Sequence, residues 1–102
     1  MIHVIAHIGT KSGKRDAVLR EFALVVPLVR AEKGCIEYVP IVDAEGAGAL
    51  TTPLGPDAFA VIEKWETMED LRAHAAAPHM AAYGAKVRDM IASRAIHVLT
   101  AA

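Results

Sequence analysis

The sequence predicts a single α+β domain over residues 1–102, with strands and helices in the order β-α-β-β-α-β. Alternating or β-branched apolar residues predict four strands, and other regions repeat their apolar residues at helical spacing. No linker or internal repeat divides the chain into two cores. This order is typical of the ferredoxin-like fold, an antiparallel sheet that helices cover on one face only.

The first strand is predicted at the N-terminus, before a turn at residues 9–13. Apolar Ile2, Val4, Ala6 and Ile8 alternate with His3, Ile5 and His7. His3 and His7 share the opposite face. At a rise of about 3.3 Å per residue they lie roughly 13 Å apart, which is too far to bind one metal ion together. We therefore expect no shared metal site on this strand.

A long helix is predicted to begin at Ser12 or Lys14 and to end at Glu32. Its apolar residues recur along one side: Val18, Phe22, Val25 and Val29. This spacing is typical of a helix that packs on a core. Pro27 lacks a backbone N–H and clashes with the preceding turn, so we expect a kink near Val26 or a break into two pieces.

The second strand is predicted after Gly34, the expected helix stop, and runs from Cys35 to Val42, where β-branched residues and a tyrosine are enriched. Residues 43–57 then include three glycines and two prolines. This segment is long for a connection between two strands. It is either a tolerated surface insertion, or a lid or dimer arm.

The third strand is predicted over residues 59–66, and alternate positions place four side chains on one face: Phe59, Val61, Glu63 and Trp65. Thr67 and Asp70 form a start signal for a short helix that resembles a capping box. His74 follows Leu71 by about one turn. It therefore lies on the apolar side of this helix.

A further helix is predicted to begin near His79, because Pro78 interrupts the preceding one. Its apolar face carries Met80, Tyr83, Val87 and Met90 or Ile91. The last strand is predicted from Arg94 to Thr100, where apolar residues alternate again.

Composition limits the partners of this chain. Hydrophobic residues make up 54% of it and aromatic residues only 5%. This is more aliphatic surface than one small domain easily covers, so we expect a homodimer. Abundant alanine, which tolerates exposure, is the alternative explanation. A net charge of −1 and the absence of a basic run argue against nucleic acid as a partner.

Cys35 is the only cysteine, which excludes an internal disulfide and is typical of a reducing compartment. The N-terminal segment has neither a basic region nor a long apolar run, so we expect no signal peptide and no membrane span. These features predict a cytoplasmic protein that does not bind membranes. Because Cys35 lies in an apolar strand, we interpret it as a buried structural residue rather than a nucleophile.

Familiar catalytic motifs are absent, including a phosphate loop, HExxH, CxxC and a nucleophile elbow. Glu63, Trp65 and His74 could instead form a small polar group inside an apolar pocket that suits an aromatic ligand. A histidine can remove a phenolic proton near neutral pH, and a partly buried carboxylate can orient it. The alternative is structural: Trp65 belongs to the core, Glu63 pairs with a lysine or arginine, and His74 caps a helix or makes a local hydrogen bond.

A resemblance to a known family rests on three segments: VPLVRAEKGCIEY, FAVIEKWETMEDLRAH and APHM. In this order and at these distances they closely resemble the antibiotic biosynthesis monooxygenase superfamily, including its quinol monooxygenase-like proteins. The E-x-x-G-C segment of that family and the strand tyrosine after it are matched by Glu32, Gly34, Cys35 and Tyr38. Its E-x-W strand, L-x-x-H helix and P-H pair are matched by Glu63, Trp65, Leu71, His74, Pro78 and His79. The resemblance covers nearly the whole chain.

This resemblance implies a dimeric α+β barrel of two ferredoxin-like protomers, each with an apolar cavity between sheet and helices. It also implies oxidation of a quinol, anthrone or related phenolic aromatic by O2, with no flavin, haem or metal cofactor. An electron-rich phenolate can itself reduce O2 once it is deprotonated in a dry pocket. A small-molecule binding protein or an isomerase on the same fold is the alternative, because fold does not determine chemistry.

The resemblance also suggests roles for individual residues. His74 is expected to be the catalytic base or proton relay, Trp65 an aromatic wall and donor, and Glu63 an orienting group. The residues expected to bind the substrate are Tyr38, Phe59, Leu71 and Tyr83. Tyr38 is in addition a secondary hydrogen-bond donor.

Two departures from the family pattern are visible. Segment 43–57 is longer than the usual hairpin, so the pocket mouth or the dimer contact is expected to differ. The related haem-degrading branch would show an asparagine on the first strand and a histidine on the last helix. This chain contains no asparagine, and Tyr83 and Gly84 lie near where that histidine would fall. Haem degradation is therefore not expected.

Overall fold

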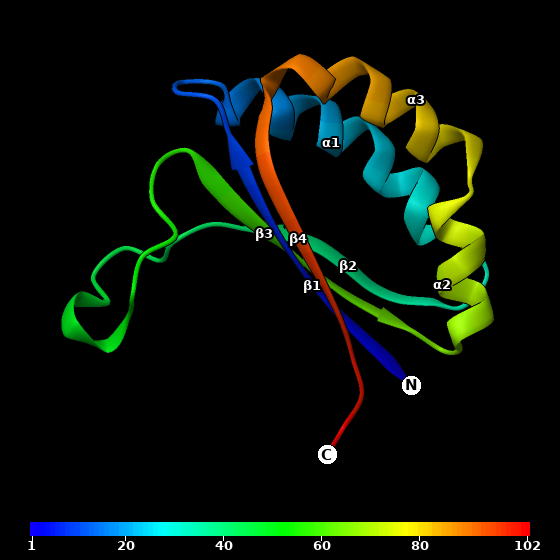
Figure 1. Cartoon of the computed structure of the whole chain (residues 1–102). Coiled ribbons are helices and arrows are strands. Elements are labelled where there is room, and N and C mark those ends of the chain that lie inside the picture. Colours follow the sequence, from blue (N-terminus) through cyan, green and yellow to red (C-terminus); the bar gives the residue numbers. More distant parts are fainter.

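The computed structural model describes residues 1–102 and confirms the predicted fold class (Figure 1). The elements, with η for a short 3₁₀ helix, are β1 (Ile2–Thr10), α1 (Arg15–Arg30), β2 (Cys35–Ile41), η1 (Gly48–Leu50), β3 (Ala58–Trp65), α2 (Met68–Ala75), α3 (Pro78–Val87), η2 (Arg88–Met90) and β4 (Ile91–Leu99). The strands form one antiparallel sheet in the order β2-β3-β1-β4. Figure 1 shows the α-helices gathered over one face of this sheet.

The register of the sheet determines which side chains face the helices. Val4 of β1 pairs with Glu63 of β3 on one side and with Val98 of β4 on the other. Tyr38 of β2 pairs with Glu63 from the opposite edge. Paired residues of neighbouring strands point to the same face. These four side chains therefore form one row beneath the helices, with the carboxyl group of Glu63 in the middle of it.

Helix α1 is uninterrupted from Arg15 to Arg30, so the predicted break at Pro27 is wrong. Pro27 lies in the last turn, where it removes a single hydrogen bond. Its own carbonyl still accepts the N–H of Ala31 (3.2 Å). The buried residues of the helix, on both sides of the proline, are Val18, Phe22, Val25, Val26 and Val29. Their packing on the core stabilises the helix through this position.

The start of α2 is capped as predicted, because the Thr67 hydroxyl accepts the N–H of Asp70 (3.1 Å). Pro78 is the first residue of α3, a position where its missing N–H costs no hydrogen bond. Gly34 lies against the start of α2. It has a φ of +79°, and a Cβ at this position would collide with the side chain of Asp70. Glycine is therefore required here for both conformation and space.

Strand β4 begins at Ile91, earlier than the predicted start at Arg94. Ile91 pairs with Thr10 at an irregular step in the register of β1. Ala92 and Ser93, which follow Ile91, interrupt the apolar alternation. A pattern based on alternation therefore places the start of this strand too late.

The core lies between the sheet and α1, and Phe22 is at the centre of its aromatic contacts. Its ring stacks on Tyr38 (centroids 5.4 Å apart) and meets Phe59 and Tyr83 edge-on (6.0 and 5.7 Å). Such pairs contribute about 0.5–1.5 kcal/mol each beyond the area that they bury. Cys35 packs against this core, and burial raises the pKa of its thiol. A protonated thiol is a poor nucleophile, which supports a structural role.

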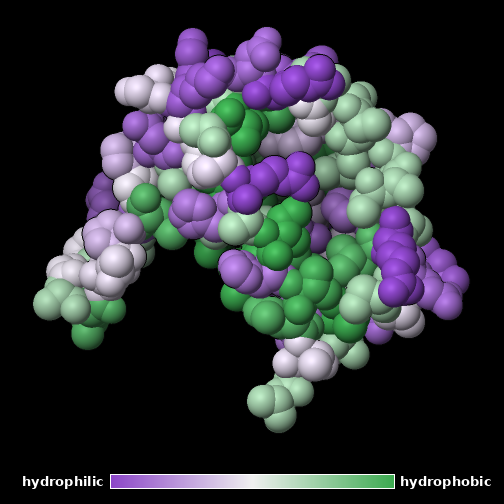
Figure 2. Space-filling model, in the orientation of Figure 1, coloured by the Kyte–Doolittle hydropathy of each residue, from purple (hydrophilic) through white to green (hydrophobic).

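The opposite face of the sheet carries no helix. Its large apolar residues are exposed or only half-buried: Ile5, Val39, Ile41, Ile62 and Leu99. Nearly all of edge strand β4 is exposed as well. Figure 2 shows purple and paler green residues over the helices, whereas the most hydrophobic residues gather around the strands. An apolar surface of this kind is typical of a protein that binds a partner.

Residues 43–57, here called the arm, project away from the sheet on the left of Figure 1. The carboxylate of Asp43 accepts the N–H groups of Leu54 and Gly55, both at 2.8 Å. These two hydrogen bonds close the base of the arm and lower the pKa of Asp43. Leu50, at the far end of the arm, is 94% exposed.

Candidate active site

A cavity of about 1000 Å³ lies between the sheet and helices α2 and α3. Hydrophobic side chains provide 19 of its 26 lining residues, which suits a ligand that is largely apolar. The lining residues come from all four strands and from all three α-helices. None belongs to the arm, so the arm is not a lid over the cavity of its own chain.

The structure brings most of the predicted site residues to this cavity. Those that line it are Tyr38, Phe59, Glu63, Leu71, His74 and Tyr83. Trp65 does not line it, because its side chain is completely buried in the core. Its indole Nε1–H donates to Oε1 of Glu63 (2.9 Å). Trp65 can therefore act on a ligand only through the residues that it contacts on the cavity wall.

Glu63 is an acid held in an apolar wall. It is 7% exposed, and no lysine or arginine forms an ion pair with it. Burial raises the pKa of Glu63, and this effect exceeds the opposing effects of the hydrogen bond from Trp65 and of nearby His74. The protonated form of this carboxyl group therefore persists to higher pH than that of an exposed glutamate. In that form it can donate a hydrogen bond to a ligand.

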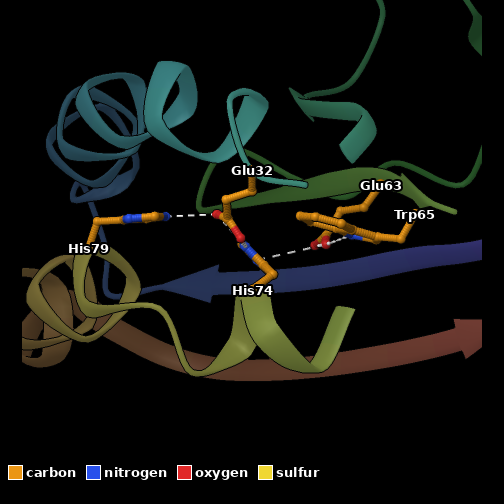
Figure 3. A network of polar contacts seen from close by, with 5 residues as sticks. All are labelled: Glu32, Glu63, Trp65, His74 and His79. Atoms are coloured by element: carbon orange, nitrogen blue, oxygen red, sulfur yellow. Dashed lines mark hydrogen bonds and ion pairs between the residues drawn. The ribbon is translucent and has the colours of Figure 1, made fainter. Parts of the chain in front are cut away.

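His74 and Glu63 belong to a chain of polar contacts that also includes Glu32 and His79 (Figure 3). Nδ1 of His74 lies 3.0 Å from Oε2 and 3.2 Å from Oε1 of Glu32. Nε2 of His74 lies 4.0 Å from Oε1 of Glu63. On the other side, Nε2 of His79 lies 2.7 Å from Oε2 of Glu32. Glu32, in the turn after α1, thereby connects α2 and α3.

Aromatic rings hold the imidazole of His74 in place. Its centroid is 4.7 Å from that of Trp65 and 5.3 Å from that of Tyr38, and the whole residue is only 6% exposed. The alternative prediction of a local hydrogen bond for His74 is wrong, because its partner Glu32 is 42 residues away in the sequence.

Comparison with known proteins assigns the family. The sequence model of the family described as antibiotic biosynthesis monooxygenase matches residues 1–86. The chain belongs to the antibiotic biosynthesis monooxygenase family. A relative from Escherichia coli K12, named probable quinol monooxygenase YgiN, is 42% identical over 101 residues, which cover 97% of this chain and 96% of that protein. A protein of the same name from Shigella flexneri matches equally well.

Solved structures share the fold of this antibiotic biosynthesis monooxygenase family member. Rv0793 from Mycobacterium tuberculosis aligns with a TM-score of 0.80 at 24% identity, over 99% of this chain and 94% of that one. PA3566 from Pseudomonas aeruginosa aligns with a TM-score of 0.81 at 24% identity, over 99% of this chain and 93% of that one. At this identity the likeness supports the fold alone.

Two polar residues of this family member were not predicted as site residues. In the sequence, Glu32 stands out only within the E-x-x-G-C segment, and His79 only as a helix start and as part of the P-H pair. Both lie in the segments that carry the family resemblance, which is the one signal that could have pointed to them. Their contact depends on the fold, since 47 residues separate them in the sequence.

Other polar groups on the cavity wall are neutral donors or cations. Burial raises the pKa of Tyr38 far above its usual range and that of Tyr83 to about 12, so both phenols stay protonated at neutral pH. Arg72, Arg88 and Arg94 also line the cavity, are exposed, and form no ion pair. Such cations favour an anionic ligand over a neutral one.

Other histidines lie away from the cavity. His3 and His7 occupy β1 but do not line it. No group of three or more histidine, cysteine, aspartate or glutamate residues is arranged to bind a metal ion.

None of the helices combines the length and apolar composition needed to cross a membrane.

Proposed function

We propose that this family member is a monooxygenase that uses O2 to oxidise a quinol, anthrone or related phenolic aromatic, with no flavin, haem or metal cofactor. The family match and the 42% identity to the E. coli protein named probable quinol monooxygenase YgiN support this proposal. The observation that carries it is the position of His74 and Glu63, a base and an acid 4.0 Å apart on the wall of an apolar cavity.

The proposed reaction begins at the phenolic proton of the substrate. His74 removes this proton, and the remaining phenolate is electron-rich enough to reduce O2 where water is excluded. Arg94 stabilises the phenolate by its charge. The carboxyl group of Glu63 and the phenol of Tyr83 form hydrogen bonds that orient the oxygen atoms of the substrate.

Atoms and electrons balance in this reaction without an added reductant. With a quinol, one atom of O2 forms a new C–O bond to the ring and the other leaves as water, together with two hydrogen atoms of the substrate. The substrate supplies all four electrons, and the product is a hydroxyquinone. An anthrone gives an anthraquinone and water by the same stoichiometry.

Oxygen uptake tests the proposed function. With a panel of quinols and anthrones, we expect the protein to consume one O2 per substrate molecule and, with isotopically labelled O2, to place one labelled atom in the product. Parallel reactions without protein correct for spontaneous oxidation. Binding of these compounds without oxygen uptake or oxygenated product would contradict the proposal and would favour a binding protein or an isomerase.

We also propose that a second copy of the chain covers the free face of the sheet. Ile5 is 41% exposed there, and its apolar neighbours are similarly uncovered. Sedimentation equilibrium should give twice the 10.9 kDa mass of one chain. Ile5→Lys should yield the single-chain mass, because it would bury a charge at the contact. Leu24→Lys, at an apolar position that is 68% exposed on α1, is the matched control and should remain dimeric. A wild-type mass near 10.9 kDa at micromolar concentration would refute the dimer.

A further inference from the structure

Glu32 contacts two histidines, and the proposed reaction gives it no role. Two imidazole nitrogens lie within hydrogen-bond distance of its carboxylate: Nδ1 of His74 at 3.0 Å and Nε2 of His79 at 2.7 Å. Its side chain is 15% exposed, and no lysine or arginine pairs with it. An ionised carboxylate accepts hydrogen bonds and cannot donate them. Each imidazole nitrogen that faces Glu32 must therefore carry a hydrogen.

The tautomer of His74 follows from this requirement. A neutral imidazole carries one N–H, so a hydrogen on Nδ1 leaves the lone pair on Nε2. Nε2 has no hydrogen-bond partner in the protein, and its nearest acid is Glu63, whose Oε1 lies 4.0 Å away. Because His74 and Glu63 both line the cavity, the only unpaired basic nitrogen of this ring is available to a ligand.

We propose that Glu32 is a positioning residue that holds His74 in the Nδ1–H tautomer, so that Nε2 is the atom that accepts the substrate proton. This inference rests on the proposed function for its kinetic consequence. When Nε2 gains the proton, the ring becomes an imidazolium, and the carboxylate 3.0 Å away stabilises its charge. His79 donates to the same carboxylate from the solvent side, where its side chain is 25% exposed, and orients it.

The tautomer can be observed directly in the ligand-free protein. Long-range proton–nitrogen correlation spectra of protein with labelled histidines distinguish Nδ1–H from Nε2–H. The signal that disappears from the spectrum of His74→Gln belongs to His74. We expect the Nδ1–H form in wild type and in Glu32→Asp, and a shift toward Nε2–H in Glu32→Gln, whose amide can donate to a bare Nδ1. A neutral His74 found as Nε2–H in wild type would overturn the proposal.

Kinetics test the consequence of the tautomer for the reaction. In hydrolases whose catalytic histidine is held by an aspartate, replacing that carboxylate by an amide lowers kcat by about 10⁴ because the wrong tautomer forms. We expect Glu32→Gln to lower kcat of quinol oxidation at least 100-fold, on the order of that effect, with KM changed little. Glu32→Asp should restore most of the loss. Glu45→Gln, in the exposed arm, is the matched control and should match wild type.

The two measurements separate failure of this inference from failure of the proposed function. If the wild-type protein oxidised no quinol, the proposed function would be refuted, and the spectra would still identify the tautomer of His74. Normal kcat in Glu32→Gln, with quinol oxidation intact in wild type, would refute the positioning role alone. A merely structural Glu32 would instead change the unfolding midpoint and leave the tautomer of His74 as in wild type.

Discussion

Replacing His74 by glutamine should lower the rate of quinol oxidation by about 10²- to 10⁴-fold, the usual contribution of a general base. Glutamine keeps a polar group of similar reach at the cavity wall, but it cannot accept the phenolic proton. The loss should appear in kcat, because the apolar wall that binds the ring is unchanged. Initial rates of oxygen uptake over a range of quinol concentrations measure both kcat and KM.

His97→Gln is the matched control for this change. His97 lies on β4, is exposed, and does not line the cavity. This variant should keep the wild-type rate, provided that sedimentation shows its assembly unchanged. Equal kcat values for His74→Gln and wild type, with circular dichroism showing that both are folded, would show that His74 is not the base.

Truncating Trp65 to alanine should destabilise the protein by about 3–5 kcal/mol, the usual cost of removing a large aromatic side chain from a core. The indole is completely buried. Its removal leaves a cavity and also leaves the carboxyl group of Glu63 without its N–H donor. Since a domain of this size is stable by only about 5–15 kcal/mol, the loss is a large part of the total. Urea unfolding followed by circular dichroism, at one fixed protein concentration, measures it.

Trp65→Phe separates the two components of that loss. Phenylalanine retains most of the apolar packing but cannot donate to Glu63, so the cost should fall to about 1–3 kcal/mol, the penalty for an unsatisfied buried group. Equal losses for the two variants would show that the hydrogen bond dominates. A loss below 1 kcal/mol for Trp65→Ala would contradict the core position of this residue.

Much of the fold could be predicted from local patterns. The partial alternation of apolar residues in β1 and β3, and the Thr67 signal before α2, reflect local requirements that a sequence shows directly. A kink or a break was predicted near Pro27, and the break is absent because tertiary packing overrides a local preference in the last turn of α1. The predicted start of β4 was too late, because Ile91 joins the strand through its pairing with Thr10, a contact between residues far apart in the sequence.

The candidate site could be predicted only in part. Glu63 and His74 follow from strand and helix periodicity, which places both on apolar faces of neighbouring elements. The position of Glu32 could not be predicted in this way. It lies after α1, while its partners lie on α2 and α3, and only the packed fold brings the three together. The role of Trp65 also changed, because periodicity shows which face it shares with Glu63 but not that Glu63 lies between it and the cavity.

Trp65 is the only tryptophan of the chain, and this has a practical consequence. Its ring lies 4.7 Å from the ring of His74 and donates a hydrogen bond to Glu63. The fluorescence of an indole is quenched more strongly by a neighbouring imidazolium than by a neutral imidazole. With excitation beyond the absorption of tyrosine, the emission of unlabelled protein therefore comes from one indole behind the cavity wall that contacts both His74 and Glu63, so ligand arrival and proton transfer can be followed optically in real time.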